Sequence, residues 1–124
     1  MKKEYVRRIT VFEDHFISFR KTLTKDALKK VYQVLTLIMV MEEVPEKFLK
    51  SIEGKRGLYE VRIEWGNNTY RVFCCFDEDN TVVLLNGFQK KTQRTPKNQL
   101  DKAQRLMNKY FEQKNNIGNG QQGL

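Results

Sequence analysis

The feature that most restricts the fold is a run of short apolar segments between residues 58 and 88, separated by turn sequences. In LYEVRIEW (58–65), apolar and charged residues alternate with a period of two, which is typical of a half-buried strand. GNNT (66–69) and DEDN (77–80) are turn sequences, and the apolar segments YRVFCCF and TVVLLNGF follow them. The run therefore predicts three consecutive antiparallel strands.

The turns also predict the register and the two faces of this sheet. A first turn at residues 67–68 places Trp65 opposite Tyr70, on an apolar face that we expect to pack against helices. A second turn at residues 78–79 adds the third strand. The other face is then a mixed surface, made up of Glu60, Arg62, Glu64, Arg71, Phe73, Cys75, Val82, Leu84, Asn86 and Phe88.

Helical patterns precede the strands. Residues 4–12 predict a strand, and a short helix follows it. Thr24 can cap a second helix, whose apolar residues recur at helical spacing from Leu28 to Met39. A second apolar stripe at 34, 37, 41 and 44 predicts that this helix is buried on two sides, in the core or under a partner. Pro45 predicts the start of another short helix, which Gly54 would end.

The last helix is predicted to begin after Thr95 and Pro96, a cap and first-turn pair. Residues 114–124 contain three glycines and few apolar residues, and they predict a flexible tail. The sequence thus predicts one α+β domain over residues 1–113 and a tail over 114–124. In this domain, N-terminal helices pack on a small antiparallel sheet that a C-terminal helix follows.

Positive charge is concentrated in one segment. The chain has a net charge of +8, and residues 87–110 hold seven cations and one acid. This local excess favours a polyanionic partner such as nucleic acid or a ribosome, although positive charge that only keeps the protein soluble is the alternative. We expect a cytoplasmic protein with no membrane partner, because no apolar run is long enough for a membrane span and no signal peptide is apparent.

The cysteine and histidine content argues against a disulfide and a metal site. Cys74 and Cys75 are adjacent in a predicted strand, where side chains point to opposite faces, so a disulfide between them would be strained. With His15 as the only histidine, these cysteines lack the further ligands that a metal site needs. We therefore expect no metal and no cofactor.

Three motifs in the second half of the chain are similar to a known family. They are GLYEVR (57–62), YRVF (70–73) and LNGFQKKT (85–92), the last leading into Thr95 and Pro96. In this order and spacing they resemble the RelE/HigB superfamily of toxins from type II toxin-antitoxin systems, most closely its phage-derived HigB-like branch. The resemblance spans residues 54 to 111.

The resemblance implies a RelE-like microbial RNase fold and a metal-independent endoribonuclease that cuts messenger RNA in the ribosomal A site, inhibiting translation. It also implies a cognate helix-turn-helix antitoxin as partner. By position, the residues that handle the scissile phosphate correspond to Arg71, Lys91, Lys90 and Arg62, which we expect to be catalytic. The expected RNA-binding residues are Lys55, Arg56, Arg94, Lys97, Lys102, Arg105 and Phe88.

RNA cleavage of this kind needs no metal, because the 2′-hydroxyl of the RNA can attack the adjacent phosphorus. The protein must then take up a proton, stabilise negative charge and protonate the leaving 5′-oxygen. Arg71 suits the charge role, since a guanidinium can bind two phosphate oxygens at once. Lys91 is the acid/base candidate, because neighbouring cations favour the neutral form of a lysine; Glu60 or Glu64 could be the base instead.

Other interpretations of the same residues stay open. Arg71 falls opposite Glu64 in the predicted register and could form a surface ion pair. Lys90 and Lys91 could be a solvated strand end, and the cations of the last helix could attract ribosomal RNA without any role in cleavage. At the level of function, the alternatives are a ParE-type toxin directed at gyrase and a non-catalytic basic RNA-binding module.

Overall fold

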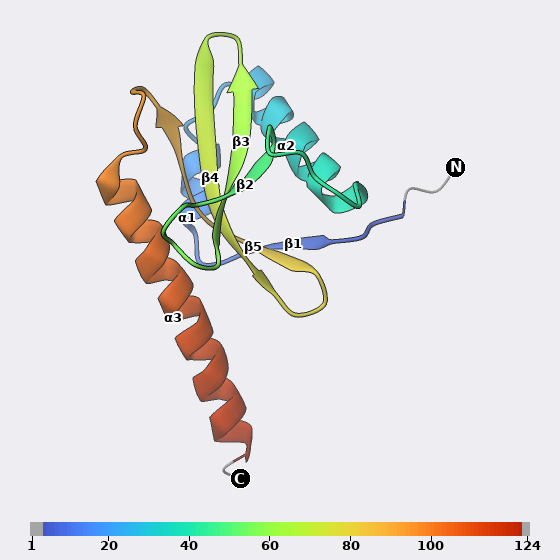
Figure 1. Ribbon diagram of the computed structural model, residues 1–124, viewed down its shortest axis with the longest axis vertical. Helices are drawn as coiled ribbons and strands as arrows, with labels where there is room; N and C mark the ends of the chain where they lie inside the picture. Colours follow the sequence, from blue (N-terminus) through green and yellow to red (C-terminus); the bar gives the residue numbers. More distant parts are fainter. Residues whose placement is uncertain (1–3, 123–124) are drawn as a thin grey trace.

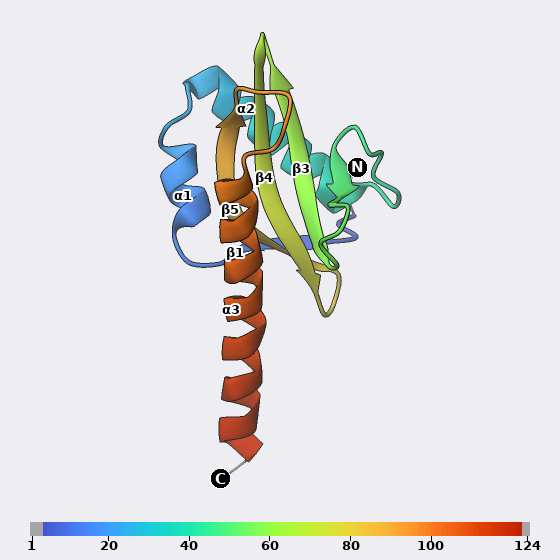
Figure 2. The ribbon, with the colours of Figure 1, turned by 60° about the vertical axis from the view of Figure 1, so that its left-hand side comes forward.

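The computed structural model describes residues 4–122 and places them in a five-stranded sheet with three helices (Figures 1 and 2). The elements follow in the order β1 (Arg8–Val11), α1 (His15–Arg20), α2 (Lys25–Val40), β2 (Leu49–Ser51), β3 (Leu58–Trp65), β4 (Asn68–Asp77), β5 (Thr81–Lys90) and α3 (Lys97–Gln122). Within these residues, no helix is long and apolar enough for a bilayer crossing. The α+β class and the three-stranded centre are confirmed.

The helices cover both faces of the sheet. α1 and α2 pack on one face, in a core that includes Phe16, Val31 and Ile38. α3 packs on the other face through Ala103 and Met107 and continues well beyond the sheet (Figure 1). The second face of the meander is therefore a mixed surface only near its β3–β4 turn, since α3 buries the remainder against a second core.

The outer strands extend the predicted meander in both directions. The strand order is β1-β5-β4-β3-β2, with β1 parallel to β5 and the other pairs antiparallel.

The short helix predicted from Pro45 is wrong. The Pro45 carbonyl accepts bonds from the amides of Phe48 and Leu49, which makes a single turn, and the chain then pairs with β3 as β2. The open edge of β3 thus outweighs the local helical signal.

The β3–β4 register differs from the predicted one but keeps the same faces. The turn is Gly66–Asn67, so Trp65 pairs with Asn68 instead of Tyr70. Gly66 has a φ of 58°, which a two-residue hairpin turn with glycine first requires. Because the shift is two residues, every side chain of β3 and β4 stays on its predicted side.

The β4–β5 register corrects part of the predicted face. A longer turn pairs Asp77 with Thr81, so Val82 and Leu84 lie on the α1–α2 side and not on the second face. A β-bulge between Val72 and Cys74 then shifts the phase of β5, and Phe88 returns to the α3 side.

The helix ends follow the predicted signals. The Thr24 side chain accepts a bond of 3.2 Å from the Ala27 amide and caps α2. α3 begins at Lys97, directly after Thr95 and Pro96, and runs through the predicted tail as far as Gln122. Of the second apolar stripe on α2, Val34 is buried while Leu37 is half-buried. The domain boundary at residue 113 stays a prediction.

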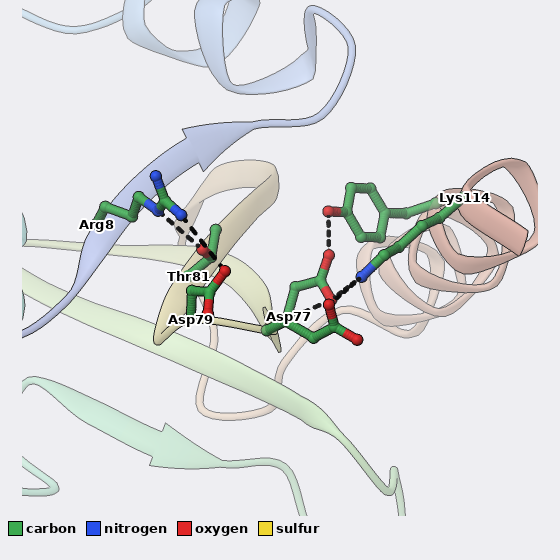
Figure 3. Close-up of polar contacts among 7 residues, drawn as sticks. Arg8, Asp77, Asp79, Thr81 and Lys114 are labelled. Carbon is green, nitrogen blue, oxygen red and sulfur yellow. Dashed lines mark hydrogen bonds and ion pairs between the residues drawn. The ribbon is translucent and has the colours of Figure 1, made fainter. Parts of the chain in front are cut away.

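Asp77, at the end of β4, anchors the far half of α3. Its carboxylate accepts bonds of 2.5 Å from the Tyr110 hydroxyl and from Lys114 Nζ (Figure 3). Burial raises the pKa of Asp77, but the bonds from Lys114, Tyr110 and the Glu78 amide outweigh it and hold that pKa below its ordinary value. Burial and the same bond raise the pKa of Tyr110 to about 12. The cluster fixes the direction of α3, whose first turns flank the site described next.

Candidate active site

Two adjoining clefts lie where the uncovered part of the sheet meets the loop before α3. The first, named the Arg71 cleft, has a volume of about 190 Å³ and is lined by Glu64, Thr69, Arg71, Lys90, Thr92 and Gln93. The second, the Arg62 cleft, has a volume of about 330 Å³, and its lining includes Lys50, Glu53, Glu60, Arg62, Lys90 and Thr95. Lys90 borders both clefts, so it joins them into one continuous site.

The strand register brings the cations of this site together. Arg62 on β3 pairs with Arg71 on β4, and Arg71 pairs with Phe88 on β5. Like charges directly opposite each other in a sheet repel, so this arrangement needs a counter-charge. Glu60 supplies it: its Oε2 lies 2.9 Å from Arg71 Nε and 3.3 Å from Arg62 Nε.

Arg71 is the most tightly held residue of the site. Its side chain is only 4% exposed, and that of Glu60 is 12% exposed. Its Nη1 donates to the Tyr70 carbonyl at 3.1 Å and lies 3.6 Å from Glu64 Oε1. The 2.9 Å contact with Glu60 is an ion pair that is not aligned as a hydrogen bond.

This arrangement leaves one edge of the guanidinium available. Among residues 4–122, Arg71 Nη2 donates no hydrogen bond, whereas Nη1 donates to the Tyr70 carbonyl and Nε contacts Glu60. A planar guanidinium that is fixed on two sides cannot rotate freely, so the remaining donors have a defined direction. The exposed-ion-pair interpretation is therefore wrong for Arg71, which is a buried and oriented cation.

Lys90, and not Lys91, shares the clefts with Arg71. Phe88 and Lys90 are two residues apart on β5 and lie on the Arg71 side of the sheet. Lys91 follows the end of the strand, is exposed and lines neither cleft. The structure therefore does not place the predicted acid/base candidate at the guanidinium, because strand alternation selects its neighbour.

The predicted RNA-binding residues fall into separate regions. Arg94 is exposed in the loop beside the Arg71 cleft, where its carbonyl accepts a 2.8 Å bond from Thr92. Lys97 forms an ion pair of 2.9 Å with Asp101, which raises the pKa of Lys97 and lowers that of Asp101. The positive charge of Lys55 also contributes to the lowered pKa of Asp101. These residues lie around the start of α3, next to the clefts.

Other predicted residues lie away from the clefts. Arg56 lines a groove of about 610 Å³ along the far half of α3. Lys102 borders a cavity at the edge of β5, and Arg105 is exposed on α3. Phe88 is only 7% exposed and packs on Phe73 at 5.5 Å between ring centroids, so the prediction that it stacks on a base is wrong for this conformation. The second face of the sheet is less exposed than predicted, because α3 covers most of it.

Sequence analysis missed Lys50 as a site residue. Lys50 pairs with Glu60 across β2 and β3 and lines the Arg62 cleft. The segment containing it was predicted as a helix, which removed it from the sheet. The strand has only three residues, Leu49–Ser51, which are too few to show a period of two in the sequence.

The described residues show no cluster of His, Cys, Asp and Glu side chains that could hold a metal ion. Cys74 and Cys75 are both buried and free, and burial raises the pKa of each thiol, to about 12 for Cys75. They are core residues and do not contribute to the clefts.

The sheet order, with helices on both faces, and the clefts beside Arg71 define a small α+β protein with a RelE-like fold. A solved chain of the archaeal RelE–RelB complex from Pyrococcus horikoshii OT3 has the same fold, with a TM-score of 0.51 and 22% identity, over 73% of this chain and 99% of its own length. No curated protein matches the chain significantly. Residues 18–108 match the family described as phage derived protein Gp49-like, and the chain belongs to that family.

Proposed function

We propose that this protein is the toxin of a type II toxin-antitoxin system and acts as a metal-independent, ribosome-dependent messenger RNA endoribonuclease in the cytoplasm. The observation that carries this proposal is the buried, oriented Arg71, which lines a cleft that Lys90 also borders. Membership of the Gp49-like family supports the toxin class.

In the proposed reaction, the 2′-oxygen of the RNA bonds to the adjacent phosphorus and the bond from phosphorus to the 5′-oxygen breaks. A base takes the 2′-hydroxyl proton, and an acid gives a proton to the leaving 5′-oxygen. Arg71 and Lys90 stabilise the extra negative charge on the phosphate. A donor of this kind typically accounts for on the order of 3 kcal/mol of transition-state stabilisation.

Glu60 has two roles in this proposal. It orients Arg71, and it is the carboxylate nearest to the paired arginines. Glu60 is thus a base candidate, while Lys90 replaces Lys91 as the acid candidate. Neither cleft is lined by a histidine or a tyrosine, so we propose that the ribosome arranges the RNA and assists proton transfer.

The partner that restrains this activity is proposed to be a helix-turn-helix antitoxin. The solved chain with this fold comes from a RelE–RelB complex, which supports a protein partner for this chain as well. α2 also presents a groove of about 900 Å³, whose lining includes Leu28, Tyr32 and Leu37. This half-exposed apolar side is a surface on which such a partner can pack.

The test is expression of the chain without antitoxin, with RNA ends mapped across translated messages. Wild type should arrest growth and produce cuts that depend on translation. Arg71→Ala should lower the cleavage rate roughly 100-fold to 1000-fold, as for loss of one preorganised donor. Lys90→Ala should lower it strongly, whereas Lys91→Ala removes the same charge from the adjacent exposed position and should lower it far less.

Other outcomes would identify a different activity. Growth arrest with intact messages and damaged DNA would replace the proposal with a gyrase-directed toxin. RNA binding by a harmless protein would replace it with a non-catalytic RNA-binding module. Equal effects of Lys90→Ala and Lys91→Ala would contradict the role given to the clefts.

A further inference from the structure

A third cavity lies at the open edge of β5, on the other side of this strand from β4. β1 pairs with β5 only from Thr81 to Leu84, so in the described structure the later part of β5 has no strand on that side. A cavity of about 370 Å³ occupies this place between α1 and α3. We name it the edge cavity, and its polar lining includes His15, Ser18, Thr22, Asn86, Gln99 and Lys102.

Asn86 is the unusual residue of the edge cavity. It is only 2% exposed, and its Nδ2 donates to both the backbone oxygen and Oε1 of Gln99, each at 3.1 Å. Its Oδ1 is buried and has no donor among the described residues. Buried side-chain acceptors almost always have a partner. Because neighbouring atoms cover this oxygen, a ligand in the cavity would reach it only if the carboxamide turned toward the cavity.

The charges around the edge cavity favour an anionic ligand. Lys102 borders it, and none of its lining residues is acidic. Glu13 is not among the lining residues, and its carboxylate contacts His15 Nε2 at 3.0 Å and Lys109 Nζ at 2.6 Å. Glu13 has a φ of 59°, a left-handed conformation that is uncommon for a residue with a side chain. This conformation and the two contacts hold His15 in a defined position at the cavity.

Size and lining chemistry together fit a nucleotide. The volume is within the range of small-molecule sites, about 300–1000 Å³. Neighbouring carboxamides such as Asn86 and Gln99 present donors and acceptors that match the edge of a nucleobase, and a lysine binds phosphate.

We propose that the edge cavity binds one nucleotide of the RNA substrate, with the base at Asn86 and Gln99 and a phosphate near Lys102. The RNA identity of the ligand rests on the proposed function. Gln89 borders the edge cavity, while Lys90, the next residue, borders both clefts of the cleavage site. One RNA strand passing over the end of β5 can therefore reach both places.

Titration of ¹⁵N-labelled full-length protein with the four ribonucleoside 5′-monophosphates tests the inference. At least one of them should shift the side-chain amide resonances of Asn86 and Gln99. Ribose 5-phosphate and inorganic phosphate should not shift them. Lys102→Ala and Gln99→Ala should each weaken the affinity at least about fivefold, because each removes a direct polar contact. Lys29→Ala, which removes an exposed lysine of α2, is the control and should leave the affinity unchanged.

The outcomes separate this inference from the proposed cleavage activity. Arg71→Ala should lose cleavage and keep nucleotide binding at the edge cavity. Shifts in a wild type that does not cut RNA would leave the edge cavity as a nucleotide site and overturn only the proposed function. Cleavage with no shift of Asn86 and Gln99 would overturn the edge cavity alone. Equal shifts with inorganic phosphate, or shifts only with an antitoxin peptide that adds to β5, would also overturn it.

Discussion

The substitution Glu60→Gln tests whether one carboxylate holds the two opposed arginines of the site. Glu60 Oε2 lies 2.9 Å from Arg71 Nε and 3.3 Å from Arg62 Nε. The substitution removes the charge but keeps the size of the side chain and one acceptor oxygen. It leaves two paired guanidinium groups, one of them with a side chain only 4% exposed, without their shared counter-charge.

The expected loss follows from burial. Removing one partner of a buried ion pair costs on the order of 3–5 kcal/mol of unfolding free energy. Glu64 lies 3.6 Å from Arg71 Nη1 and retains part of the attraction, and the new amide oxygen still accepts a bond. We therefore expect Glu60→Gln to lower the free energy of unfolding by about 2–3 kcal/mol. The control Glu64→Gln changes a side chain that is 64% exposed and should cost less than about 1 kcal/mol.

Urea denaturation followed by circular dichroism measures both changes. A double-mutant cycle isolates the pair itself, because Arg71→Met removes the buried charge that Glu60 compensates. The double substitution should cost less than the sum of the two single substitutions by about 1.5 kcal/mol or more. Additive costs, or equal costs for Glu60→Gln and Glu64→Gln, would refute the assignment of Glu60 as the shared counter-charge.

Three further predictions concern other parts of the molecule. The pKa of Asp77 in the folded protein is lowered below its ordinary 3.8, so the bonds of its carboxylate stabilise the protein above about pH 4 and weaken as the pH falls below that value. Asp77→Asn should therefore reduce the loss of unfolding free energy on acidification. Urea denaturation at a series of pH values measures this. A Cβ at Gly87 would lie 2.5 Å from Cδ2 of the Phe19 ring, so Gly87→Ala should lower the unfolding free energy by roughly 1–3 kcal/mol, and a stable Gly87→Ala protein would contradict that packing. Arg105 is exposed on α3, and Arg105→Ala should reduce the salt dependence of single-stranded RNA binding by about 0.7 in log–log slope without changing sequence preference.

The alternating pattern predicted the central sheet because period two is a strong constraint on residues 58–88. The faces of β3 and β4 were robust to a register error, since a shift of two residues moves no side chain across the sheet. The predicted face of β5 was wrong for Val82 and Leu84. Its turn contains Asp79 and Asn80 at positive φ, and the bulge, where Leu85 and Asn86 lie opposite Phe73, changes the phase again. Neither the extra turn residue nor the bulge has a distinct sequence signature here.

The candidate site could be predicted as a region but not as a set of contacts. The motif containing Arg71 pointed to the correct strand, yet nothing in the sequence indicated that Glu60 would bury its guanidinium. Whether Lys90 or Lys91 lies on the Arg71 side of the sheet depends on which residues of β5 point to that side, and only the structure shows this. β2 formed because β3 offered an unpaired edge, a tertiary effect that local propensity does not contain.

The same geometry relates stability to the proposed chemistry. Opposed arginines would destabilise the sheet, and the carboxylate that stabilises them also restricts Arg71 to one orientation with Nη2 free. An RNA phosphate that enters the cleft meets donors that are already oriented, so little reorganisation is needed at the moment of reaction. In the proposed reaction, charge stabilisation is the contribution that these oriented cations support, since neither cleft is lined by a histidine or a tyrosine. If the ribosome assists proton transfer as proposed, cleavage of free RNA should be much slower than cleavage during translation.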